Sequence, residues 1–377
     1  MFGERSFTTT AAPSAARSSA WHRPTPCAAP VTTATLPVNA PMSPPVKISV
    51  SDTVSEITRV GQWPQNHQCG SRARITGESV GDTVGSMRAA ESPVALVTGA
   101  SRGIGRGIAI ALGQRGFHVV LTGRTVDEGR GLNPSTGRAL TGSLSSTLAA
   151  IEAAGGSGRM IRHDVLDIDD ASTPIDDAFA HEGRLDVLVN NAVYVGPGND
   201  SLFADNDPAD IVKRVTGNLT APLLLTRRFV EKVIGQSPHP RLGVSGWVVD
   251  ITSDAGRRTP ERMAGNGGWS LVYAATKAGF HRIADMVAHE YGHRGVRAIN
   301  VNPGLVATER VLDSGTSLAW IAEHGVRPYV IGEAVVRLLG DPLIGNGAYV
   351  HAQEYLREAM GDENYRTFVD RQPEGPQ

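Results

Sequence analysis

Short apolar runs rich in β-branched residues alternate with stretches of helical periodicity from Val94 onward. This alternation is typical of a parallel sheet covered by helices on both faces, because each parallel connection needs a crossover. The runs expected to form strands are Val94 to Thr98, His118 to Thr122, Arg159 to His163, Leu185 to Asn190, Trp247 to Thr252, Val296 to Val301 and Ala348 to Gln353. Helices are expected to begin near Ile104, Leu144, Asp169, Pro208, Leu271 and Gly332, with a less regular helical lid between Glu309 and His324. The pattern predicts one doubly wound α/β domain.

The segments outside this pattern differ in composition. Residues 1–90 are rich in Ala, Ser, Thr and Pro without a sustained period, which indicates a disordered or low-complexity extension. We expect the folded domain at 91–360 and a polar tail at 361–377. The first forty residues hold Glu4 as their only acid, a composition typical of organelle transit peptides. They show no clear amphipathic helix, so we expect a cytoplasmic protein and keep organelle targeting as the alternative.

Charge and cysteine usage limit the classes of partner. The net charge is -2, with 36 Lys and Arg against 38 Asp and Glu. This balance predicts a small-molecule partner rather than nucleic acid or a membrane surface. Cys27 and Cys69 both lie in the extension, so the domain is expected to lack disulfides and Cys-based metal sites. Histidine and acidic residues also lack metal-ligand spacing, and we expect no metal.

A glycine-rich turn follows the first strand. Thr98-Gly99-Ala100-Ser101-Arg102-Gly103-Ile104-Gly105 leads directly into an apolar helical pattern. Glycine lets the chain turn tightly, approach a pyrophosphate closely and pack the helix on the strand. The free N–H groups at the start of that helix bind phosphate. The turn therefore predicts dinucleotide binding on a Rossmann-type sheet.

The GxxxGxG spacing of this turn resembles the signature of the short-chain dehydrogenase/reductase family, and the resemblance extends from about Val94 to Gly340. Further motifs of the family follow in the expected order: Asp164, Asn190-Asn191-Ala192, Ser253, Tyr273-Ala-Ala-Thr-Lys277, and Asn302-Pro303-Gly304 through Thr308. The resemblance implies an NAD(P)-dependent oxidoreductase that interconverts a ketone or aldehyde and an alcohol.

The second strand ends in Gly123-Arg124-Thr125, where NAD-specific sites carry an acid that holds the ribose hydroxyls. An arginine accommodates the 2′-phosphate of NADP instead. Arg102 in the glycine turn offers a second guanidinium for that phosphate. We therefore expect NADP(H) in preference to NAD(H).

The resemblance implies further contacts with the cofactor. Asp164 and Val165 are expected at the adenine, and Asn191 and Ala192 at the adenosine ribose. The loop at 303–308 is expected to meet the nicotinamide carboxamide. The full expected cofactor set is Gly99, Ser101, Arg102, Gly103, Ile104, Gly105, Arg124, Asp164, Val165, Asn191, Ala192, Tyr273, Lys277, Pro303, Gly304, Val306 and Thr308.

Tyr273 and Lys277 are four apart in a helical pattern, so they share one helix face. A nearby ammonium favours phenolate, and we expect it to lower the tyrosine pKa for proton exchange. Ser253 ends its strand and is expected to hydrogen-bond the substrate oxygen, with Thr252 as its competitor. The resemblance implies that Asn218 is the fourth catalytic residue and helps to hold a water that links the lysine to solvent.

Three features depart from the family pattern. Val193 and Tyr194 stand where a glycine normally follows the Asn-Asn-Ala motif. Extra residues at 256–269 predict a flap over the active site. The last strand lacks the family's Asp-Gly-Gly ending, which puts the usual tetramer contact in doubt, although we expect a homo-oligomer by analogy.

The substrate is not specified by these motifs. Five aromatic residues are candidates for an apolar substrate pocket, with ordinary core packing as the alternative: Tyr194, Phe203, Trp269, Trp320 and Tyr329. One rival function is a non-catalytic NADP(H)-binding sensor on the same fold, and another is a dehydratase or epimerase of the extended relatives. The intact catalytic set argues against the sensor, and the short loops argue against the extended relatives.

Overall fold

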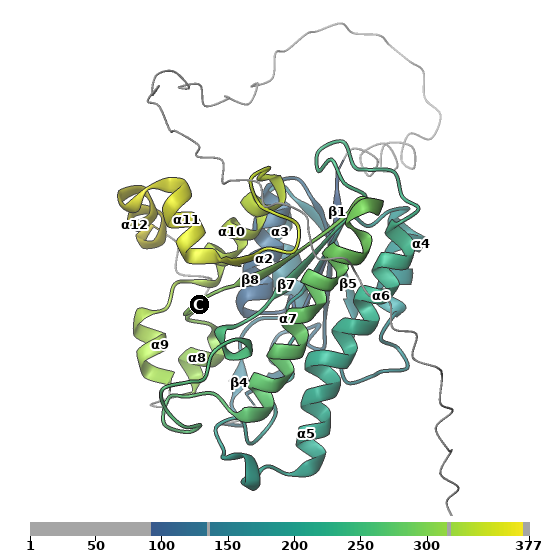
Figure 1. Ribbon diagram of the computed structural model, residues 1–377. Helices are drawn as coiled ribbons and strands as arrows, with labels where there is room; N and C mark the ends of the chain where they lie inside the picture. Colours follow the sequence, from purple (N-terminus) through teal and green to yellow (C-terminus); the bar gives the residue numbers. More distant parts are fainter. Residues whose placement is uncertain (1–91, 134–135, 315–317, 372–377) are drawn as a thin grey trace, which may run out of the picture. The chain divides into compact units, whose positions relative to one another are not determined.

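The computed structural model describes residues 92–133, 136–314 and 318–371 (Figure 1). The extension expected at 1–90 lies outside these residues. The described part folds around a seven-stranded sheet in the order β5-β2-β1-β6-β7-β8-β9, in which every neighbouring pair is parallel. The strands are β1 (Val94–Thr98), β2 (His118–Gly123), β5 (Ser157–Arg162), β6 (Val187–Asn190), β7 (Gly246–Ile251), β8 (Val296–Asn302) and β9 (Tyr349–His351). The predicted doubly wound parallel sheet is confirmed.

The strand order reverses between β1 and β6, whose backbones pair from Ala95↔Val187 to Val97↔Val189. The chain moves outward from β1 through β2 to β5 and then returns to the other side of β1. Such a reversal leaves a crevice at the carboxyl ends of the two central strands, where doubly wound sheets bind ligands. The glycine turn and Asn191 follow these two ends.

Helices cover both faces of the sheet (Figure 1). Alternate strand residues such as Val97 and Val189 pack in one core cluster with α2, α3 and α10. Their neighbours Leu96 and Leu188 pack in a second cluster with α4, α6 and α7. The bounds are α2 (Gly103–Gln114), α3 (Leu144–Ala153), α4 (Thr173–Glu182), α5 (Pro208–Val215), α6 (Ala221–Val233), α7 (Leu271–Tyr291) and α10 (Pro328–Gly340).

Three segments differ from the sequence prediction. A short antiparallel ribbon, β3 (Gly131–Leu132) and β4 (Ala139–Leu140), follows β2 and was not predicted. The last strand ends at His351 because the helix α11 (Ala352–Met360) begins there. The expected polar tail contains α12 (Asp362–Asp370), whose Tyr365 is only 7% exposed, so apolar burial holds this segment to the domain.

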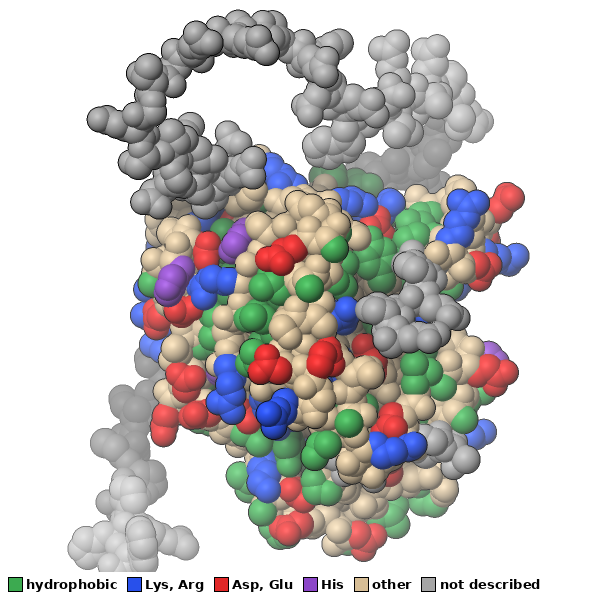
Figure 2. Space-filling view, turned by 180° about the vertical axis from the view of Figure 1, so that it is seen from behind, with side chains coloured by type: hydrophobic (Ala, Val, Ile, Leu, Met, Phe, Trp, Pro, Cys, Tyr) green, Lys and Arg blue, Asp and Glu red, His purple; other side chains and the backbone are tan. Residues whose placement is uncertain are grey.

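The lid expected between Glu309 and His324 contains two short helices, α8 (Glu309–Asp313) and α9 (Ala319–His324). On the face in Figure 2, basic and acidic side chains are interspersed, as the near-zero net charge suggests. Among the described residues, no helix is both long and apolar enough to cross a membrane.

Candidate active site

The turn between β1 and α2 requires its glycines. Gly99 and Gly103 have φ values of +68° and +57°, in the left-handed region that side chains disfavour. A Cβ on Gly105 would lie 2.3 Å from the carbonyl oxygen of Gly99. Gly105 therefore serves close packing within the turn, and it does not line the pocket beside it.

Asn191 links the two central strands at the crevice. Its Nδ2 donates to the Thr98 carbonyl at 2.8 Å, and its backbone N–H donates to the Thr98 hydroxyl at 2.9 Å. The Ala192 N–H donates to the same hydroxyl at 3.0 Å. Asn191 thus fixes the shape of the crevice, in addition to lining the pocket.

A pocket at this crevice collects ten of the expected cofactor residues: Gly99, Ser101, Arg102, Gly103, Ile104, Arg124, Val165, Asn191, Ala192 and Thr308. Eight further residues that were not among the expected cofactor contacts also line it: Thr122, Gly123, Thr125, His163, Val193, Tyr194, Glu309 and Arg310. Seven expected cofactor residues do not line it: Gly105, Asp164, Tyr273, Lys277, Pro303, Gly304 and Val306. Asp164 instead accepts a hydrogen bond from the Leu166 N–H at 3.1 Å, which closes the turn after β5.

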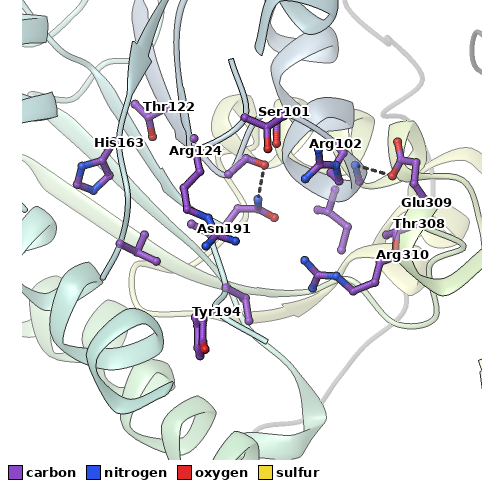
Figure 3. Close-up of a pocket in the computed structure, with 18 residues that line it drawn as sticks. Ser101, Arg102, Thr122, Arg124, His163, Asn191, Tyr194, Thr308, Glu309 and Arg310 are labelled. Carbon is purple, nitrogen blue, oxygen red and sulfur yellow. Dashed lines mark hydrogen bonds between the residues drawn. The ribbon is translucent and has the colours of Figure 1, made fainter. Parts of the chain in front are cut away.

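Three arginines give the pocket a positive field. Arg124 and Arg310 extend toward its middle from opposite sides (Figure 3). Arg102 donates from Nε to the Thr141 carbonyl at 3.0 Å and from Nη2 to the Gly142 carbonyl at 2.7 Å. Burial lowers the pKa of Arg310, and Arg102 and Arg124 lower it further by repulsion. The Arg310 Nε is buried and makes no hydrogen bond to a described residue, which leaves it available to an anion.

Glu309 occupies the start of helix α2. Its Oε2 accepts a hydrogen bond from the Gly103 N–H at 2.8 Å (Figure 3). The Gly103 N–H has no acceptor within its own helix, because it lies at the helix N-terminus, the place where a phosphate binds in dinucleotide sites. The carboxylate therefore takes the position of an anionic ligand, and the donor set fits a dinucleotide.

The expected catalytic residues Ser253 and Tyr273 follow the carboxyl end of β7, Ser253 in the loop and Tyr273 in the first turn of α7. Ser270 caps helix α7, because its hydroxyl accepts the Tyr273 N–H at 3.3 Å. Burial raises the pKa of the Tyr273 hydroxyl, while a hydrogen bond with Ser253 and the charge of Arg310 oppose the rise. Thr252 is buried and directs its hydroxyl toward His281, so Ser253 is the hydroxyl beside the tyrosine.

Lys277 was expected to contact the cofactor, but it does not line the pocket. Its side chain is buried, and Nζ donates to the Ile251 carbonyl at 2.7 Å. The expectation that this ammonium lowers the tyrosine pKa is wrong for this structure, because burial dominates at Tyr273 and raises the pKa. Burial also lowers the pKa of Lys277 to about 8, and the charge of Asp250 opposes that change.

Asn218 lies in a π-helical turn, Thr216–Thr220, between α5 and α6. Its Oδ1 accepts from the Tyr194 N–H at 2.7 Å, and its Nδ2 donates to the Tyr194 carbonyl at 3.0 Å. π-Turns inside helices are frequent at functional sites. Both amide atoms of Asn218 are thus used to hold the backbone that follows β6.

The loop after β8 is held in place by a residue of helix α11, close to the C-terminal end of the chain. Gln353 donates to the carbonyls of Pro303 and Leu305 at 2.8 and 2.9 Å. The Val306 side chain is buried in the core. Thr308 reaches the pocket directly over Gly103, where its Cγ2 would lie 3.3 Å from an added Cβ.

Of the five candidate aromatics, Tyr194 lines the pocket, and Phe203, Trp269, Trp320 and Tyr329 do not. Tyr329 donates to Gln114, the last residue of α2, at 2.5 Å. Trp320 is 59% exposed and stacks on His324, and Phe203 is 52% exposed. The extra loop at 256–269 packs at Gly265 against Asp200.

Comparisons with known proteins agree with this geometry. A family model described as short chain dehydrogenase matches residues 93–317. A 3-oxoacyl-[acyl-carrier-protein] reductase from Synechocystis sp. is 32% identical, over 71% of this chain and 96% of its own length. A metagenomic short-chain oxidoreductase solved with NADP is 29% identical, with a TM-score of 0.52 over 70% of this chain and 97% of that one. A 3-oxoacyl-[acyl-carrier protein] reductase from Brucella melitensis solved with NAD, at 23% identity, shares the fold, with a TM-score of 0.57 over 69% of this chain and 95% of that one.

Proposed function

The chain belongs to the short-chain dehydrogenase/reductase family and is an NAD(P)-dependent oxidoreductase, and from this premise we propose that it reduces a ketone or aldehyde with NADPH. The observation that carries the proposal is the Tyr273 hydroxyl. It lies beside Ser253 and within the field of Arg310, a residue that lines the dinucleotide pocket. Burial raises the pKa of this hydroxyl, so at neutral pH it carries a proton, the proton that reduction of a carbonyl requires.

Each residue of the proposed catalytic set has one task. When bound, NADPH would supply the hydride for this reduction. Tyr273 donates its phenolic proton to the carbonyl oxygen, so that hydride and proton together yield the alcohol. Ser253 donates a hydrogen bond to the same oxygen and orients it. Asn218 holds the Tyr194 backbone, and Lys277 holds its buried ammonium on the carbonyl of Ile251, two residues before Ser253.

NADP(H) preference is supported by the arginines of the pocket. Arg124 follows β2, where an acid would otherwise take the ribose hydroxyls. Arg102 and Arg310 line the same pocket, and their positive charges also attract anionic phosphate. We propose a small carbonyl compound as the substrate; the relative from Synechocystis sp. is likewise named for the reduction of a 3-oxoacyl group.

A panel of ketones, aldehydes and alcohols, followed by the absorbance of NADPH, tests the proposed function. We expect NADPH oxidation with at least one carbonyl class at neutral pH. If NADPH binds tightly and no member of the panel is turned over in either direction, the non-catalytic sensor is the better description.

Glu309 is expected to compete with the cofactor for the Gly103 N–H. An acidic side chain at a helix N-terminus is worth about 0.3 to 1 kcal/mol, so Glu309→Gln should lower the Kd for NADPH about two- to fivefold. Fluorescence titration measures this change. Glu323→Gln is the matched control, because Glu323 is an exposed acid on α9. A weaker affinity in Glu309→Gln would show that Glu309 assists binding.

We further propose a cytoplasmic homo-oligomer that associates through the groove between α6 and α7. This groove is lined partly by apolar residues, among which Leu223 and Met286 are 46% and 38% exposed. Exposed apolar surface of this kind favours protein contacts. Light scattering should give a mass above that of one chain, and Leu223→Glu should reduce it. A monomeric wild-type protein would contradict this proposal.

A further inference from the structure

Three polar side chains form a buried row across the sheet. Asn190, Asp250 and Asn300 are paired in register on β6, β7 and β8. Their exposures are 2%, 0% and 1%. The residues two positions earlier on the three strands all belong to the apolar cluster under α6 and α7, so the row faces those helices.

Each member of the row has an acceptor oxygen without a donor. The Asn190 Nδ2 donates to Asp250 Oδ1 at 2.8 Å and to Thr226 at 2.9 Å, and the Asn300 Nδ2 donates to the His281 carbonyl at 2.9 Å. Asn190 Oδ1, Asp250 Oδ2 and Asn300 Oδ1 are buried and receive no hydrogen bond from a described residue. Buried acceptors without donors are costly. A proton on Asp250 Oδ2 turns one acceptor into a donor and can satisfy an adjacent amide oxygen.

Lys277 lies next to this row. Its buried Nζ donates to the carbonyl of Ile251, the residue after Asp250. Lys277 and Asp285, both on α7, are the charged groups that act on Asp250. The neighbouring β6, β8 and α6 present the neutral Asn190, Asn300 and Thr226.

The electrostatics agree with this arrangement. Burial raises the pKa of Asp250 to about 7, while Asn190 and the charge of Lys277 oppose the rise. Burial lowers the pKa of Lys277 to about 8, while Asp250 opposes the fall. Each group therefore stabilises the charged form of the other, and both change charge near neutral pH.

We propose that Asp250 is a positioning residue for the reaction, a buried acid whose carboxylate keeps Lys277 charged above neutral pH, on the helix that carries the catalytic tyrosine. The proposal rests on the proposed function for the role of Lys277. Above neutrality the Asp250 carboxylate holds Lys277 as an ammonium, and below neutrality Asp250 is a neutral acid that donates within the row. The proton exchanges with solvent, so no other reactant takes part.

Thermal unfolding of the full chain tests the buried acid without any need for catalysis. Because the pKa of Asp250 is raised above its ordinary 3.8, the stability that its proton provides is present at low pH and is lost as the pH rises through about 7. The Tm of wild type minus that of Asp250→Asn should therefore fall between pH 5 and pH 8. Glu290→Gln is the matched control, because Glu290 is an exposed acid on the same helix α7, and it should not reproduce this fall. Parallel Tm curves for wild type and Asp250→Asn would overturn the proposal.

Two further measurements test the coupling to Lys277. Lys277→Met removes the charge that lowers the pKa of Asp250, so the pH at which stability is lost should move upward, and an unchanged midpoint would exclude the coupling. In Asp250→Asn, the alkaline limb of kcat/KM should move to lower pH, because Lys277 loses its counter-charge. A pH profile identical to that of wild type would reject the positioning role, even where the Tm data confirm a titrating Asp250.

Discussion

Tyr273→Phe is expected to lower kcat by about 10²- to 10⁴-fold, the usual contribution of general acid catalysis. The change removes the phenolic proton and preserves the ring, which belongs to a partly buried residue at the start of α7. The tyrosine does not line the dinucleotide pocket, so the Kd for NADPH should change less than about twofold. Single-turnover kinetics and fluorescence titration measure the two quantities separately.

Tyr291→Phe is the matched control, because Tyr291 ends the same helix away from Ser253. It should leave kcat within about twofold of wild type. Should Tyr273→Phe keep turnover within a few-fold of wild type, another group must supply the proton. Arg310, the charged neighbour of the tyrosine, would then be the first residue to change.

Much of the fold follows from local patterns in the sequence. The glycine turn and the first strand are set by neighbouring residues, and the structure places both where the pattern predicts them. Helix α12 had a local signal as well, since Tyr365, Phe368 and Val369 recur at helical spacing. The polar composition of this segment led to the prediction of a tail. Tyr365 packs in the core cluster, and this contact attaches the helix to the domain.

The parts of the site that the sequence analysis missed depend on contacts between distant segments. Glu309 meets Gly103 across 206 positions, and no local pattern in the lid indicates that contact. The direction of Lys277 depends on the Ile251 carbonyl, which α7 reaches only once it packs on β7. The sequence motif predicts the spacing of Tyr273 and Lys277, whereas burial in the folded domain is the main cause of the pKa shift of each.

The choice between cofactors is the sharpest test of the pocket. Arg124→Ala removes a charge-assisted hydrogen bond to phosphate worth about 1.5 to 3 kcal/mol, which corresponds to about a 10- to 150-fold loss of NADPH affinity. The Arg124 side chain is 58% exposed, so solvent and salt screen it and the loss should lie near the lower limit. NADH has no 2′-phosphate, and its affinity should change little. Arg162→Ala is the matched control, an exposed arginine on the adjacent strand β5.

Arg124→Asp should reverse the preference, because the new carboxylate repels the phosphate and accepts from the ribose hydroxyls. Asp164, 4.0 Å from the Arg124 guanidinium, would add to that repulsion. Arg102→Ala should weaken NADPH less, and it should also affect NADH, since Arg102 holds the carbonyls of Thr141 and Gly142 beside the pocket. Titration of each variant with both cofactors in one buffer separates these effects. Equal losses for NADPH and NADH in Arg124→Ala would mean that Arg124 supports the loop, and a wild-type preference for NADH would refute the NADP(H) assignment.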